Sequence, residues 1–293
     1  MRSAREVSTR RVPVPALFGV SAVFHYLGPA LAVLLFAHLG ALGVAWLRIA
    51  GAAVVFAAWR RPWRLVRRPR PGGAGTRRWV LVALGVVLAL MNSCFYLAIA
   101  RLPLSTVGAV EFLGVVILAA VGVRSRRNLL ALLLATAGVL TLTDIRLAAQ
   151  PLGLAFAFAN CGLFMLYVVL GHRVANTGAA GTGSGIDALA AAMVVAAAVA
   201  TPFGVAPAGP AFSHIGLLLA GLGVGVCSSV IPYVTDQLVM ARVPRATFAL
   251  MLTVLPASAT VIGVVVLHQV PTVPELLGIA LVAAGVAAHQ PAG

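Results

Sequence analysis

Residues 100–106 read ARLPLST, and residues 241–247 read ARVPRAT. The two copies are 141 residues apart in a chain of 293, and each lies between two long apolar stretches. Proline just before a helix fits the first turn without the loss of a hydrogen bond, so each copy is typical of a joint between two helices. The match predicts that the chain consists of two similar halves, residues 1–148 and residues 149–293.

The composition indicates the class of protein. Hydrophobic residues make up 61% of the chain and charged residues 9%, which is too little charge to cover a water-soluble domain. A helix needs about 20 apolar residues to cross the hydrocarbon core of a bilayer. Ten stretches approach this requirement: 14–37, 41–59, 79–100, 104–123, 128–145, 151–171, 186–205, 214–234, 247–267 and 275–289. We therefore expect an all-α integral membrane protein with ten transmembrane helices.

The arginines predict how these helices are oriented. All 21 basic residues are arginines, and with the N-terminus inside, 18 of them fall on the inner side. Only Arg101 and Arg146 fall in outer loops, and Arg48 lies within a span. Because arginine accumulates on the cytoplasmic side of membrane proteins, we expect a multi-pass protein of the cell inner membrane with both termini in the cytoplasm.

The same distribution bears on the partners of the protein. The net charge of +15 is explained by the membrane orientation, so it does not call for a nucleic-acid partner. The partners that the sequence predicts are the lipid bilayer and a small-molecule substrate. The oligomeric state stays open.

An odd number of helices in each half has a consequence for the arrangement of the halves. With five helices in each, the second half must be inverted relative to the first, so that Pro103 lies outside and Pro244 inside. Inverted repeats are common in secondary transporters, whose substrate site lies between the halves near the middle of the bilayer. We therefore expect a secondary transporter that works by alternating access.

Four stretches carry a resemblance to a known family: WLR at 46–48, MNSCFYLAI at 91–99, EFLG at 111–114 and IPY at 231–233. In this order they resemble helices two, three, four and eight of the threonine/homoserine exporters. That family belongs to the drug/metabolite transporter superfamily with EamA-type repeats. The resemblance implies ten helices in two inverted five-helix repeats, no cofactor, and export of amino acids or related small metabolites.

Two charged residues lie within predicted spans. A charge at the centre of the bilayer costs about 3 kcal/mol or more, so it should face a cavity or a partner. Glu111 could bind a substrate ammonium or carry a coupling proton, or it could be a structural carboxyl between helices. Arg48 could bind a substrate carboxylate through two hydrogen bonds. The interpretation we favour for Arg48 is a fixed salt bridge or a side chain that extends to the membrane surface.

Uncharged polar residues complete the predicted substrate pathway. Asn92 and Tyr96 are four residues apart and share one face of a helix, where they could line the cavity or form interhelical hydrogen bonds. Tyr167 and Tyr233 could line the pathway, although we favour an aromatic belt at the membrane surface. His25 could relay protons, although we favour a neutral packing residue.

Prolines and one further acid also lie in or near the predicted spans. Pro29, Pro232 and Pro256 lie in or near spans, where proline frees a backbone carbonyl and bends the helix. The result could be a hinge or a binding carbonyl, or equally a plain packing kink, and Pro256 is assigned to the pathway. Asp236 is predicted near the inner end of its span. There we expect it to pair with Arg242 or Arg245 rather than to serve the pathway.

Two other functions stay open. Efflux of hydrophobic cations or drugs would also use a glutamate in the membrane. An enzyme embedded in the membrane would need nucleophiles, paired carboxylates or a metal cluster at membrane depth. The six acidic residues are scattered along the sequence, and the three cysteines lack metal-ligand spacing. We therefore expect no enzyme, no catalytic residues and no metal.

Overall fold

A computed structural model describes residues 12–60, 74–122, 125–147, 150–176, 182–244, 247–248, 251–252 and 255–288. All regular structure in these ranges is helical, which confirms the predicted all-α class. The first part of the chain forms α1 (Val14–Val33), α2 (Ala41–Arg60), α4 (Ala74–Ile99), α5 (Leu104–Gly122) and α6 (Arg126–Leu147). The second part forms α7 (Pro151–Asn176), α8 (Thr182–Gly204), α9 (Gly209–Ser213), α10 (Ile215–Gly225), the π-helical turn η1 (Val226–Val230), α11 (Ile231–Met240), α13 (Leu255–Leu267) and α14 (Val273–Ala288).

Six helical segments of the described chain are long and apolar enough to cross a membrane. They are α1, α2, α7, most of α4 and α8, and the continuous run α10–η1–α11. Shorter apolar helices lie within α5, α6, α13 and α14, in the stretches predicted as the fourth, fifth, ninth and tenth spans. The prediction of a multi-pass helical membrane protein is confirmed at this level.

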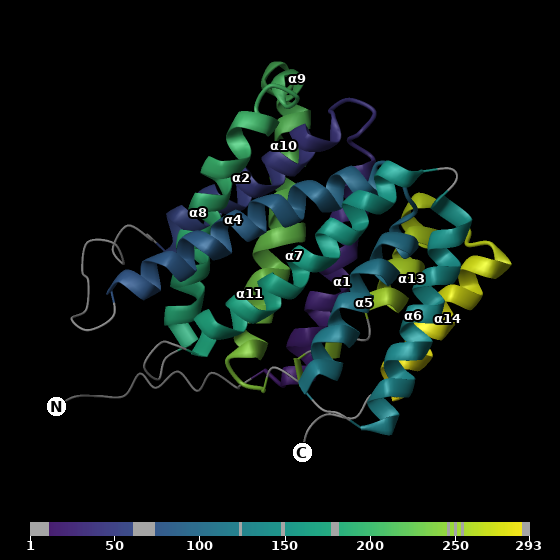
Figure 1. The fold of residues 1–293 in the computed structure, drawn as a ribbon. Coiled ribbons are helices and arrows are strands. Elements are labelled where there is room, and N and C mark those ends of the chain that lie inside the picture. Colours follow the sequence, from purple (N-terminus) through teal and green to yellow (C-terminus); the bar gives the residue numbers. More distant parts are fainter. Residues whose placement is uncertain are drawn as a thin grey trace.

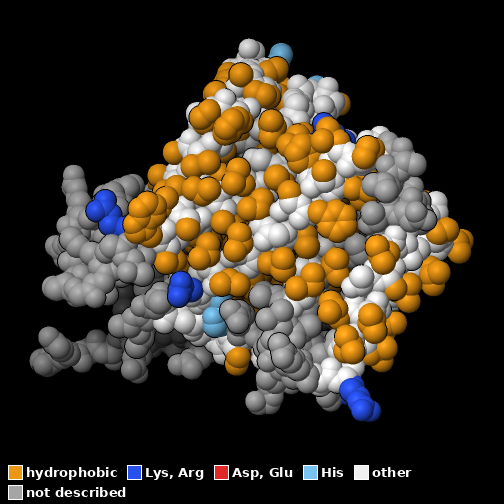
Figure 2. Space-filling model, in the orientation of Figure 1, with side chains coloured by type: hydrophobic (Ala, Val, Ile, Leu, Met, Phe, Trp, Pro, Cys, Tyr) orange, Lys and Arg blue, Asp and Glu red, His pale blue; other side chains and the backbone are white. Residues whose placement is uncertain are grey.

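The outer surface of the molecule is apolar. Leu129, Leu140 and Val265 are 58%, 62% and 68% exposed, which would be costly for large side chains of a protein in water. Figure 2 shows hydrophobic side chains spread over the face in view, with arginines near its margins. Such a surface suits contact with lipid, because the helices satisfy their own backbone hydrogen bonds.

The helices form two groups with a central layer between them. In Figure 1, α2, α8, α9 and α10 lie on one side, and α5, α6, α13 and α14 lie on the other. Helices α1, α4, α7 and α11 lie between these groups (Figure 1). The central layer brings α1 against α11 and α13, and it brings α7 against α4 and α5.

Helices α2 and α8 pack against each other in opposite directions. At the start of α2, the indole nitrogen of Trp46 donates a 2.9 Å hydrogen bond to Oγ1 of Thr201, near the end of α8. At the end of α2, Arg60 forms a 2.6 Å ion pair with Asp187, near the start of α8. Each is the second helix of its predicted half.

Helices α6 and α14 are also antiparallel, and each is the fifth helix of its predicted half. Nε of Arg127, at the start of α6, donates a 2.8 Å hydrogen bond to the carbonyl oxygen of Ala288, at the end of α14. Midway along, a Cβ at Gly138 would lie 2.5 Å from the carbonyl oxygen of Gly278. Glycine therefore allows the two backbones to approach closely, as in other membrane helix pairs.

Candidate functional site

The interior holds a pocket to which six helices contribute. It is lined by His25 and Pro29 of α1, Arg48 of α2, Met91, Asn92 and Phe95 of α4, Glu111 of α5, Asn160 of α7 and Tyr233 of α11. Its empty space is about 250 Å³, including the open mouth.

Arg48 is held in the wall of this pocket by oxygen atoms rather than by a carboxylate. It is 5% exposed, and its Nε donates a 2.8 Å hydrogen bond to Oγ of Ser229. Its Nη2 donates to the carbonyl oxygen of Ser228 at 2.6 Å and to the hydroxyl of Tyr233 at 3.4 Å. Among the described residues no carboxylate pairs with Arg48, and its Nη1 has no acceptor.

We favoured either a fixed salt bridge for Arg48 or a side chain that extends to the membrane surface, and both interpretations are wrong. The side chain makes no salt bridge within the described part of the chain, and it is too buried to extend to the membrane surface. The physical reason is that two serines from α10–η1–α11 replace the expected carboxylate. A buried guanidinium with an unused donor in a pocket can bind a carboxylate.

Pro232 makes the carbonyl of Ser228 available. In an α-helix the N–H of residue 232 would donate to the carbonyl of residue 228, but proline has no N–H. Arg48 donates to that carbonyl instead, and the helix passes through a π-helical turn just before the proline. Such π-turns occur frequently at functional sites. The sequence left a packing kink and a binding carbonyl as alternatives, and the structure shows a carbonyl bound by Arg48.

Glu111 supplies the acidic group of the pocket. It is 3% exposed and accepts a 3.1 Å hydrogen bond from the hydroxyl of Tyr26. Asn160 lines the same pocket, and neither polar atom of its buried amide has a hydrogen-bond partner within the described structure. A buried amide without partners is costly. The pocket therefore presents an acid, a guanidinium and an unsatisfied amide to a small ligand.

A hydrogen bond between Asn92 and Tyr233 joins the two predicted halves at the pocket. The hydroxyl of Tyr233 donates to Oδ1 of Asn92 at 3.2 Å, and Nδ2 of Asn92 donates to the carbonyl oxygen of Leu88 at 2.6 Å. Asn92 thus lines the cavity and also forms an interhelical hydrogen bond. Asn92 and Tyr233 are 141 residues apart, which is the offset between the two copies of the repeat.

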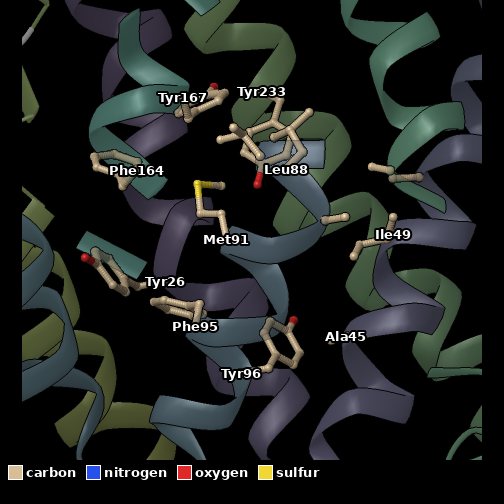
Figure 3. Close-up of a cluster of buried hydrophobic side chains, with 14 of the residues drawn as sticks. Tyr26, Ala45, Ile49, Leu88, Met91, Phe95, Tyr96, Phe164, Tyr167 and Tyr233 are labelled. Atoms are coloured by element: carbon tan, nitrogen blue, oxygen red, sulfur yellow. The ribbon is translucent and has the colours of Figure 1, made fainter. Parts of the chain in front are cut away.

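Helix α4 presents two different faces around this hydrogen bond. In Figure 3, Phe95 points toward Tyr26 and Met91 points toward Phe164 and Tyr167, whereas Tyr96 points to the other side, toward α2. The ring of Tyr96 lies 5.3 Å from the guanidinium carbon of Arg48. Tyr96 is wholly buried but is not among the residues that line the pocket. It therefore contacts the site through Arg48.

Other predicted site residues are placed as follows. Tyr167 and Tyr233 are 0% and 1% exposed and their ring centroids are 5.4 Å apart, so the favoured aromatic belt at the surface is wrong for both. His25 lines the pocket and packs edge-on against Tyr26, in agreement with the favoured packing role. The side chain of Pro256 lies outside the described residues.

Asp236 does not make the predicted ion pair. It is 1% exposed, and its two carboxylate oxygens accept hydrogen bonds from Ser21 at 2.5 Å and from Tyr167 at 3.2 Å. Arg242 donates instead to the carbonyl oxygen of Val12, and Arg245 lies outside the described residues. The prediction of an Asp236–Arg242 pair is wrong because Asp236 faces the interior, whereas Arg242 follows the end of α11 and is exposed.

Sequence reasoning missed several residues of the site. Tyr26, Asn160, Ser228 and Ser229 were not among the candidates, although each lies in an apolar stretch where a polar side chain is unusual. A signal for Tyr26 was available, because Tyr26 and Tyr167 are 141 residues apart, the same offset as the repeat. For the serines the signal was their position four and three residues before a proline.

Comparison with known proteins agrees with the resemblance. The threonine/homoserine exporter RhtA of Salmonella typhimurium strain SL1344 is 31% identical over 285 residues, which cover 94% of this chain and 92% of the relative. The chain belongs to the threonine/homoserine exporter family. Another member, RhtA of Escherichia coli strain K12, is 31% identical over 260 residues, which cover 88% of this chain and 84% of its own length.

A solved structure shares the fold of this member of the exporter family. A crystal structure of a protein with 20% sequence identity aligns over 94% of this chain and 95% of its own, with a TM-score of 0.59. This similarity shows a shared fold. No model of a protein family matches the chain.

Proposed function

We propose that the protein is a secondary transporter that exports amino acids or related small metabolites. The observation that carries the proposal is that Arg48 and Glu111 line one small pocket. A free amino acid carries a carboxylate and an ammonium a few ångströms apart. A pocket with one buried guanidinium and one buried carboxyl is complementary to both groups.

The contacts suggest a role for each group. Nη1 of Arg48 has no acceptor among the described residues and would donate to the substrate carboxylate. Glu111, held by Tyr26, would accept from the ammonium. The buried amide of Asn160 lines the same pocket and could hydrogen-bond a polar side chain of the substrate. The relatives are named for threonine and homoserine, and both of these amino acids carry a side-chain hydroxyl.

Two alternative functions fit the site less well. A hydrophobic cation would be attracted by Glu111 but repelled by Arg48 in the same pocket. A membrane enzyme would need a nucleophile or a metal beside the pocket. The names of the relatives describe exporters, which favours transport over catalysis. Comparing the sensitivity of cells to amino acids and to cationic dyes would distinguish export of amino acids from efflux of drugs.

The proposed architecture is ten transmembrane helices in two inverted halves, residues 1–148 and 149–293, with both termini in the cytoplasm of an inner-membrane protein. Antiparallel packing of α2 with α8 and of α6 with α14 supports inversion, because these helices are equivalent in the predicted repeat. The contacts of α1 with α11 and α13 likewise correspond to the contacts of α7 with α4 and α5. Rocking of such halves would open the pocket to alternate sides.

Flux through proteoliposomes tests this function. In counterflow, vesicles loaded with unlabelled threonine should accumulate labelled threonine from outside. Arg48→Gln and Glu111→Gln should each lower this exchange by about 10- to 100-fold, since deletion of a charged hydrogen-bond partner costs about 1.5–3 kcal/mol.

Matched controls exist for both variants. Arg101→Gln changes an arginine whose Nη1 donates to its own helix and whose guanidinium carbon lies 5.5 Å from the ring of Phe156. Asp187→Asn changes the acid that pairs with Arg60. Neither Arg101 nor Asp187 lines the pocket. Both should exchange threonine at nearly the wild-type rate. Unchanged exchange by Arg48→Gln and Glu111→Gln at normal protein levels would contradict the proposed substrate site.

A further inference from the structure

Asp236 is a second buried carboxyl group that the substrate pocket does not use. It is 1% exposed and lies on α11, one turn after the pocket residue Tyr233. The ring of Tyr167 packs against the ring of Tyr233, with centroids 5.4 Å apart, and the Tyr167 hydroxyl donates to Asp236. The two tyrosines therefore connect Asp236 to the pocket without opening it to the substrate.

The groups around Asp236 stabilise it without neutralising its charge. From α1 it is bonded by Ser21, and from α7 by Tyr167. In the described structure, no hydrogen bond or ion pair joins it to His25 of α1 or to Cys161, His172 or Arg173 of α7. Cys227 is the one titratable side chain of η1, and α13 has no titratable side chain. The one charged residue of α8 is Asp187, which pairs with Arg60. Arg48 of α2 bonds to the serines and to Tyr233. Within the described residues, no cation forms an ion pair with Asp236.

Helix α1 holds both buried carboxyls. Ser21 donates to Asp236, and Tyr26, five residues later, donates to Glu111. Tyr26 and Tyr167 are separated by the repeat offset of 141 residues, so each predicted half supplies a tyrosine that holds one of the two acids. A movement of α1 against α7 or α11 would thus change the surroundings of both acids together.

We propose that Asp236 is the proton-carrying residue that couples transport to the proton gradient, while Glu111 binds the substrate ammonium. This rests on the proposed transport function. A proton from the more acidic side adds to a carboxylate oxygen of Asp236 and forms the neutral acid. The same proton leaves to water on the other side after the halves have moved, so one proton enters for each substrate molecule exported. A carboxyl with no ion-pair partner suits this role, because the ionised form is costly in the closed, dry interior.

Replacement of Asp236 by asparagine separates coupling from transport. Asp236→Asn keeps the shape and a hydrogen-bond acceptor but cannot take up a proton. Threonine counterflow, which needs no gradient, should stay within about threefold of the wild type. Uptake of labelled threonine driven by an acidic vesicle lumen should fall at least tenfold, because protons leaving the vesicle no longer drive substrate in. Asp187→Asn is the control and should keep both activities.

A second variant keeps the test decisive if Asp236→Asn inserts poorly. Ser21→Ala removes one donor that favours the carboxylate over the acid, so the pH of half-maximal gradient-driven uptake should rise by about one unit. A purely structural serine would change the amount of protein but not this pH.

Three outcomes would overturn the assignment of Asp236. The first is gradient-driven uptake by Asp236→Asn at the wild-type rate, and the second is an unchanged pH profile for Ser21→Ala. The third is wild-type counterflow without any response to a pH gradient. Absence of threonine counterflow in the wild type would instead count against the proposed function itself.

Discussion

Arg48 has more hydrogen-bond donors than the surrounding helices satisfy. Ser229, Ser228 and Tyr233 fix two of its nitrogens, which leaves the guanidinium rigid and its third nitrogen without an acceptor among the described residues. The surroundings therefore orient the charge and also leave it available. Glu111 is similar, because Tyr26 fixes the carboxyl without neutralising it.

A pair of tyrosines tests whether this orientation matters. Tyr26→Phe removes the hydroxyl that holds Glu111, and a hydrogen bond to a charged group contributes about 1.5–3 kcal/mol. We expect the threonine concentration for half-maximal exchange to rise about tenfold or more.

The matched control is Tyr96→Phe. Tyr96 does not line the pocket, and phenylalanine keeps the ring that lies 5.3 Å from the guanidinium carbon of Arg48, so exchange should stay within about twofold. Equal losses in both variants would mean that the hydroxyl of Tyr26 does not act through Glu111.

At the residue scale, the sequence identified charges but not their partners. Arg48 and Glu111 could be chosen because a charge in an apolar span is conspicuous. Ser228, Ser229 and Asn160 could not, because small polar residues are common in membrane helices and only the packing shows which of them face a charge. The same limit explains the wrong partner for Asp236: sequence neighbours were favoured over Ser21, which is 215 residues away.

The helix run α10–η1–α11 is the element that positions Arg48. Its π-turn and Pro232 expose the Ser228 carbonyl, and α1 approaches the turn at Gly28, where a Cβ would lie 2.7 Å from Cα of Ser228. That distance is too short for any side chain other than hydrogen. The position of the serines thus depends on a glycine in a different helix.

Two glycines of α1 provide a matched test of this contact. Gly28→Ala should push η1 away and weaken the bonds of the serines to Arg48, so we expect at least a tenfold loss of exchange and a lower melting temperature, since overpacking costs about 1–3 kcal/mol. Gly19→Ala, with no atom within 4 Å of the new Cβ, should leave exchange unchanged and raise stability slightly. Full exchange by Gly28→Ala would show that the site tolerates movement of η1.

At the element scale, the apolar stretches predicted the helices well, because about 20 apolar residues in succession have few alternatives to a membrane helix. The π-turn could not be predicted, since its cause is a local compromise between Pro232 and the packing of α1. The close approach at Gly28 was likewise hidden, because glycine is common throughout the chain.

At the scale of the whole molecule, the central proposal is that two opposed halves enclose one pocket. The first half supplies Arg48 and Glu111, and the second half supplies Asn160 and Tyr233. The repeat at 100–106 and 241–247 predicted two halves, and the antiparallel helix pairs fit their inversion. The sequence could not predict the Asn92–Tyr233 bond, although these residues occupy equivalent places in the repeat. Equivalent residues of two repeats can be in contact or far apart in the folded protein. The outcome depends on where the two helices cross, which the sequence does not show.

Labelling of equivalent positions in the two halves tests the opposed arrangement most directly. Ala100 and Ala241 occupy the same place in the repeat and both are exposed. In a variant without the native cysteines that still exchanges threonine, Ala100→Cys should react with a membrane-impermeant maleimide in intact cells. Ala241→Cys should react only after the membrane is permeabilised. Reaction of both cysteines from the same side would contradict the inverted arrangement and the transport mechanism that depends on it.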